Sequence, residues 1–126
     1  MGQNVTKKAE NAIRNGNGII LDIRTPAEFQ QGHLCGAHLV NTPVPPLAYD
    51  RRQELYNNLK KLVRKYPNKT FIVYCKKGIR ARLAVDMLET LGVSAVSLGG
   101  IHTAPLKQIM SGQVRNDYLK PCYILP

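Results

Sequence analysis

Short apolar runs alternate with amphipathic stretches along most of the chain. Residues 19–23 and 70–74 are rich in β-branched and aromatic side chains and have almost no polar break. That pattern is typical of strands buried on both faces of a sheet. Residues 94–98 and residues 36–41 predict two further strands, and the segments between the strands show the apolar spacing of helices.

End signals mark the first two predicted helices. One covers about residues 5–14 and ends at the Asn- and Gly-rich residues 15–18, because Gly and Asn accept the left-handed backbone at a helix stop. The second follows Thr25, Pro26 and Glu28. These residues form a capping box with Pro at the first helical position, and the helix runs to about residue 31.

Two longer helices flank the predicted strand of residues 70–74. The first begins near Asp50, which we expect to form a cap with Gln53, and it ends before Pro67. The second spans about residues 79–91, with an apolar stripe on one face and Gly92 at its end. Residues 104–110 suit a short helix. We expect the tail that follows, to residue 126, to pack as an extended segment. Much of the positive charge should lie on the solvated face of the helix before Pro67.

The alternation of strands and helices predicts an α/β fold, with a small parallel sheet flanked by helices on both faces. The length of 126 residues suits a single domain. We expect a core of about residues 18–110, preceded by the helix of residues 5–14 and followed by a C-terminal extension of residues 111–126. Ligands of such sheets bind at the carboxyl ends of strands, where Cys75 lies.

The charge balance narrows the expected partners. With 18 Lys and Arg against 8 Asp and Glu, the formal net charge is +10, so the surface attracts anions or an acidic protein. Aromatic residues are few, and no basic run is interleaved with them as in a single-strand binder. Nucleic acid is therefore not expected as a partner.

Several features bear on the compartment. No apolar stretch approaches the length of a membrane span, and the start lacks a secretory signal, which predicts a cytoplasmic protein. Residues 1–6 match the pattern for N-terminal myristoylation, and membrane association is expected only if Gly2 carries that group. Three scattered cysteines suggest a reducing compartment with free thiols, and their spacing predicts no metal site.

Cys75 has the surroundings of a reactive thiol. The turn from strand to helix leaves backbone N–H groups that converge on an anion, and Gly78 lets the turn curl. Lys76, Lys77 and Arg80 place three cations within five residues of it. Helix dipole and cations together stabilise a thiolate, so Cys75 is the expected nucleophile. A structural role as a buried cysteine is the alternative, but apolar burial favours apolar neighbours.

Four spaced motifs give the chain a resemblance to the rhodanese homology domain. They are LDIRTPAEF at residues 21–29, GHLCGA at residues 32–37, VYCKKGIR at residues 73–80 and LGGI at residues 98–101. The resemblance implies the rhodanese α/β fold and a six-residue active loop, in which Lys76, Lys77, Gly78, Ile79 and Arg80 hold the substrate of Cys75. It further implies transfer of sulfur from thiosulfate to cyanide or a thiol through a Cys75 persulfide, without a cofactor.

Two departures from the family pattern stand out. Cys35 occupies a position where family members usually have Pro, and Ala81 one where Ser or Thr is frequent. The first leaves open whether a second thiol resolves the persulfide. Asp22 and Arg24 match a charged pair that is structural in the family.

Two other functions fit parts of the pattern. A cysteine phosphatase or arsenate reductase also uses a strand-loop-helix anion cradle, but its signature needs five residues between Cys and Arg, and here four intervene. A non-enzymatic module that relays a persulfide or binds a partner would use the same loop. Its basic helix would dock an acidic protein.

Overall fold

A parallel sheet forms the centre of the fold. The computed structural model describes residues 2–122, and its main sheet has four parallel strands in the order β3-β1-β4-β5. Their bounds are His38–Leu39 for β3, Gly18–Asp22 for β1, Thr70–Cys75 for β4 and Ser94–Gly100 for β5. This confirms the predicted α/β class with a parallel sheet. Strand β4 is central, so its carboxyl end, with Cys75, lies between two neighbouring strands.

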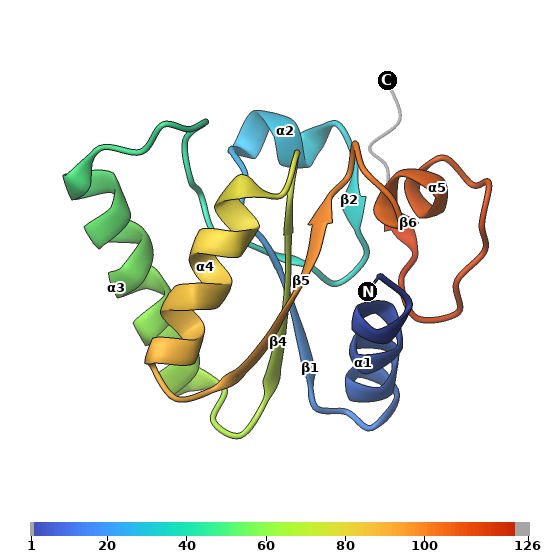
Figure 1. Cartoon of the computed structure of the whole chain (residues 1–126), viewed down its shortest axis with the longest axis horizontal. Helices are drawn as coiled ribbons and strands as arrows, with labels where there is room; N and C mark the ends of the chain where they lie inside the picture. The colour runs from blue at the N-terminus through green and yellow to red at the C-terminus, as the bar shows by residue number, and fades with distance from the viewer. Residues whose placement is uncertain (1, 123–126) are drawn as a thin grey trace.

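Helices cover the two faces of this sheet (Figure 1). Helices α3 and α4 lie on one face, and α1 and α5 lie on the other. Within residues 2–122, none of the helices combines the length and apolar character that crossing a membrane requires. The bounds are Gly2–Arg14 for α1, Pro26–Gln30 for α2, Tyr49–Lys65 for α3, Ile79–Thr90 for α4 and Leu106–Met110 for α5.

Alternate residues of β4 supply two separate cores. Phe71 and Val73 pack with Leu55 and Leu59 of α3, whereas Ile72 and Tyr74 pack with residues of α1 and α5. Side chains of a strand alternate between the faces of a sheet, which is why one apolar run serves both layers. Every β4 residue from Phe71 to Cys75 is buried, so the site rests on a rigid support.

Most of the predicted elements are present, with two corrections. The strand expected at residues 36–41 is reduced to His38–Leu39. The cap expected from Asp50 and Gln53 is wrong: Ala48 is the N-cap of α3, and no side chain caps it. Asp50 instead lies in the first turn, where its carboxylate accepts a hydrogen bond from the Arg51 nitrogen. The capping box of Thr25 and Glu28 is confirmed, with Pro26 in the first turn.

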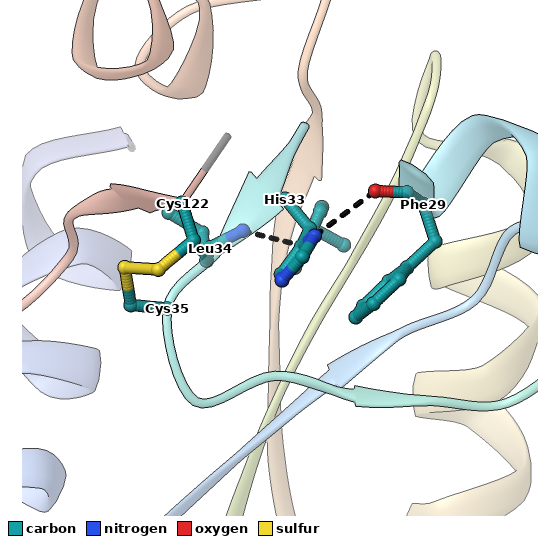
Figure 2. Close-up of a disulfide and its surroundings, with 6 residues drawn as sticks. Phe29, His33, Leu34, Cys35 and Cys122 are labelled. Atoms are coloured by element: carbon teal, nitrogen blue, oxygen red, sulfur yellow. Dashed lines mark hydrogen bonds between the residues drawn. A yellow bond between two sulfur atoms is a disulfide. The ribbon is translucent and has the colours of Figure 1, made fainter. Parts of the chain in front are cut away.

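A disulfide joins the tail to the body of the protein. Cys35 and Cys122 are bonded across a small antiparallel sheet of β2 (His33–Leu34) and β6 (Pro121–Cys122) (Figure 2). The expectation of three free thiols is therefore wrong, and Cys75 is the free cysteine. The bond forms because the pairing of β2 with β6 brings the two Cα atoms within 4.8 Å across 87 residues of sequence.

Candidate active site

Cys75 lies at the turn where β4 ends and α4 begins. Its Sγ accepts hydrogen bonds from the backbone nitrogen of Gly78 at 3.0 Å and from that of Ala81 at 3.3 Å. Gly78 makes this turn possible because its φ of 104° lies in the left-handed region. Two amides at the start of a helix thus point at one sulfur, an arrangement that stabilises a sulfur anion.

A cavity of about 200 Å³ opens above this sulfur. Cys75 itself is only 1 % exposed, so a reactant reaches it through the cavity. Lys76 is half-buried and Lys77 is exposed, which provides positive charge at the entrance. The lining residues are Val44, Pro45, Cys75, Lys76, Lys77, Ile79 and Arg80.

Arg80 also lines the cavity, but its guanidinium is held from behind. Its two terminal nitrogens donate to the two carboxylate oxygens of Glu28 at 2.8 and 3.0 Å. One of them also donates to the Thr42 carbonyl at 3.2 Å. The Arg80 side chain is 3 % exposed. This ion pair neutralises the Arg80 charge and links the loop after Cys75 to α2. Within residues 2–122, Lys76 and Lys77 are the loop cations that form no ion pair with a carboxylate.

The Glu28 carboxylate is shared between this ion pair and the cap of α2. Its Oε1 accepts from the Thr25 nitrogen at 2.9 Å as well as from Arg80. The hydrogen bond from Arg80 lowers the pKa of Glu28 to about 2, against the opposing effect of its partial burial. The carboxylate therefore stays ionised in the folded protein at pH values where an unfolded Glu is already protonated.

We expect this ion pair to make stability depend on pH. A folded-state pKa below the unfolded one adds stability above the ordinary Glu pKa, and that stability is lost as pH falls towards about 2. Glu28→Gln should lower the free energy of unfolding by about 3 kcal/mol at pH 7, because Arg80 is left buried without its counter-charge. In urea unfolding, the difference from wild type should shrink between pH 5 and pH 2.

The matched control is Glu54→Gln. Glu54 pairs with Arg51, but both side chains are more than half exposed, so little change is expected. If the free energies of unfolding of wild type and Glu28→Gln changed in parallel between pH 5 and pH 2, the stabilising role of the Glu28–Arg80 pair would be contradicted.

The end of β5 packs against the active loop. Gly100 pairs with Cys75 in the sheet, and the His102 nitrogen donates to the Lys76 carbonyl at 3.1 Å. A Cβ atom placed on Gly100 would lie 2.5 Å from the Lys77 nitrogen and closer still to the Lys76 carbonyl group. There is thus no room for a side chain at residue 100 unless the loop moves.

Gly100→Ala should therefore damage the site. We expect at least a tenfold loss of the sulfur-transfer turnover that the resemblance implies, since a displaced loop no longer aims its amides at Sγ and small misplacements at a reacting group are costly. Gly92→Ala is the control, because Gly92 has a φ of 84° and open space around it. It should lose about 1 kcal/mol of stability and keep its turnover. Equal turnover in the two variants would show that the loop tolerates displacement.

The structure brings the predicted site residues together around one cavity. Cys75, Lys76, Lys77, Ile79 and Arg80 line it, and Gly78 donates to the sulfur. Their roles remain predictions. Among residues 2–122, no group of three or more His, Cys, Asp and Glu side chains is placed to hold a metal ion. Sequence reasoning missed Val44, Pro45 and Gly100, and it interpreted Glu28 as a helix cap alone.

A second ion pair supports the same edge of the sheet. Arg24 donates to both carboxylate oxygens of Asp22 at 2.8 and 2.7 Å, and to the Gly32 carbonyl at 2.7 Å. Both side chains are buried. Neither Asp22 nor Arg24 is among the residues that line the cavity, which agrees with the structural role implied by the resemblance.

Comparisons with known proteins point to one family. The family model described as "Rhodanese-like domain" matches residues 5–102. A solved structure described as "rhodanese with anions from E. coli" is similar in fold, with a TM-score of 0.53 and 24% identity. The match covers 71% of this chain and 93% of that one.

Two curated relatives are much longer than the matched region. A "tRNA uridine(34) hydroxylase" of Buchnera aphidicola is 28% identical over 90% of this chain and 34% of its own length. A "tRNA sulfurtransferase" of Vibrio cholerae is 27% identical over 70% of this chain and 16% of its own length. The chain thus spans about a third or less of these relatives, and the activities in their names describe those longer proteins.

Proposed function

Because this chain belongs to the rhodanese-like domain family, we propose that it is a sulfurtransferase whose Cys75 carries the transferred sulfur as a persulfide. The family and its sulfurtransferase-named relatives support sulfur transfer in general. Donor, acceptor and residue roles are part of the proposal. The observation that supports it best is the Cys75 sulfur at the floor of a lysine-flanked cavity, with two backbone amides donating to it.

The first half-reaction takes sulfur from thiosulfate. The Cys75 thiolate attacks the outer sulfur, the bond between the two thiosulfate sulfurs breaks, and sulfite leaves with the electron pair. The products are sulfite and the Cys75 persulfide anion. Lys76 and Lys77 attract the dianionic donor and stabilise the departing sulfite, and the loop amides stabilise the sulfur anion.

The second half-reaction returns the enzyme to its starting state. Cyanide takes the terminal sulfur and leaves as thiocyanate, or a thiol takes it and becomes a persulfide. In both cases the bond to Sγ breaks, and Cys75 leaves as the thiolate held by the amides of Gly78 and Ala81. Two separate halves predict ping-pong kinetics.

The paired state of Arg80 argues against phosphoester chemistry. Both terminal nitrogens of Arg80 already donate to Glu28, and one of them also donates to the Thr42 carbonyl, so fewer guanidinium donors remain for a phosphate. The loop also has four residues between Cys75 and Arg80 instead of five. Hydrolysis of a phosphoester faster than thiosulfate turnover would reverse this ranking.

Intact-mass spectrometry tests the proposal directly. After incubation with thiosulfate, the chain should gain one sulfur atom, about 32 Da, as a reversible persulfide. Cyanide should remove that mass and release an equal amount of thiocyanate. If the protein gains no mass with thiosulfate but gains 32 Da from another persulfide donor, Cys75 remains the proposed carrier and the proposed donor is wrong. No gain with any donor would refute the proposal.

A further inference from the structure

Two exposed apolar side chains line the Cys75 cavity, and a third lies in a hollow between α3 and α4. Val44 is 63 % exposed and Ile79 65 % exposed, and both line the cavity. Tyr49, at the start of α3, is 70 % exposed. Monomeric proteins expose single apolar residues routinely, but a group of them around a site marks an interaction surface.

A second hollow continues this surface between α3 and α4. It has a volume of about 410 Å³, and Tyr49, Tyr56, Leu83 and Met87 supply its apolar lining, with Arg52 and Gln53 beside them. Leu83 and Met87 follow Ile79 at intervals of four residues, so the three lie on one face of α4. An apolar path therefore leads from the cavity entrance along α4, and we call it the α3–α4 groove.

The charged side chains that line the two hollows are basic. Lys76 and Lys77 lie at the cavity and Arg52 lies in the groove, and no carboxylate within residues 2–122 lines either hollow. Asp50 and Glu54 line an adjoining hollow, which shares Tyr49 and Gln53 with the groove. A ligand of this surface should therefore combine apolar side chains with acidic ones.

From this we infer that the α3–α4 groove docks a protein that accepts the sulfur, through a segment with apolar and acidic side chains around a cysteine. The inference rests on the proposed function. The partner thiol attacks the terminal sulfur of the Cys75 persulfide anion, and the bond from that sulfur to Sγ breaks. Cys75 leaves as the thiolate, and the partner keeps the sulfur and its own proton as a persulfide. No outside oxidant or reductant is needed.

Protein fits this surface better than nucleic acid does. The basic residues and the two tyrosines would suit RNA, which binds through phosphate charge and base stacking. The aliphatic residues Val44, Ile79, Leu83 and Met87 have no use in that mode. They suit a peptide segment laid along two helices.

Synthetic peptides provide the test. The probe is a peptide with one Cys flanked by Leu and Phe and then by Asp and Glu. Two control peptides are matched to it. One carries Lys in place of Asp and Glu, and the other carries Ser in place of Leu and Phe. The protein is loaded with thiosulfate, and the loss of 32 Da is followed over time. The peptide with both acidic and apolar residues should remove the sulfur from the loaded protein at roughly tenfold lower concentration than either control peptide.

Surface variants locate the contact. Tyr49→Ser with Arg52→Glu should raise the half-saturating peptide concentration about tenfold and leave discharge by cyanide unchanged. The control is Tyr118→Ser with Arg115→Glu, which changes the same residue types at exposed positions outside the groove. Equal discharge by all three peptides, or an unaffected groove variant, would overturn the inference.

Binding measured without chemistry separates this inference from the proposed function. A fluorescent version of the acidic peptide with Ser in place of Cys should bind wild type about tenfold more tightly than the groove variant, whether or not sulfur is transferred. If the protein never gains 32 Da yet binds the peptide selectively, the proposed function fails and the docking surface stands. Bulk tRNA that binds more tightly than the peptide, with the groove variant impaired, would show RNA as the occupant instead.

Discussion

Replacing Cys75 with Ser should reduce sulfur transfer from thiosulfate to cyanide by at least about a thousandfold, because removing a covalent nucleophile leaves only residual catalysis. A serine hydroxyl in the same place is not ionised at neutral pH and forms no persulfide. The variant should also show no gain of 32 Da. The measurements are initial rates of thiocyanate formation and intact mass after loading.

The matched control replaces the other two cysteines. Cys35→Ser with Cys122→Ser should keep both the mass gain and the turnover at a temperature where the variant is folded, because the disulfide lies outside the cavity. A Cys75→Ser protein that still gained one sulfur would place the carrier on a different residue. Equal turnover in Cys75→Ser and wild type would remove this thiol from the reaction.

Removing the disulfide should produce a large loss of stability. The bond closes a loop across 87 residues, and joining distant residues stabilises a fold by restricting the unfolded chain. We expect Cys35→Ser with Cys122→Ser to lower the free energy of unfolding by about 2–4 kcal/mol, measured by urea unfolding without reductant. The tail keeps its buried Leu119 and the short pairing of β6 with β2, which are weak anchors alone.

Reduction of the wild-type protein supplies the comparison. The reduced wild type should unfold at nearly the same urea concentration as the double variant, and the oxidised wild type at a clearly higher one. Alkylation of the unfolded, unreduced chain should modify one thiol, since two of the three cysteines are bonded. Three modified thiols and coincident unfolding curves would show that the bond does not form in solution.

Local signals in the sequence were enough to predict most of the main sheet and the loop after Cys75. The apolar run of residues 70–74 predicts a buried strand from its composition alone, and Thr25, Pro26 and Glu28 predict a helix start through contacts three residues apart. The loop after Cys75 is also local, because its amides belong to the same short turn. These features depend on neighbours in the chain, which a sequence displays.

Features that join distant segments could not be predicted in the same way. Glu28 and Arg80 are 52 residues apart, and nothing near either one indicates its partner. Cys35 and Cys122 meet because β6 pairs with β2, and two-residue strands leave no periodic pattern. The Asp50 cap failed for a different reason: the N-cap of helix α3 is Ala48, two residues earlier than the polar pattern suggested.

The narrow approach to Cys75 affects how long the proposed persulfide would persist. Because only 1 % of Cys75 is exposed, below a cavity of about 200 Å³, a cysteine lying flush with the surface of a folded protein would not reach the sulfur that Cys75 carries in the proposed reaction. Only compact molecules, or a thiol on a protruding tip, fit through the opening. In the proposed reaction, the narrow opening thus shields the Cys75 persulfide from unselective thiols, and the shape of the acceptor decides where the sulfur goes.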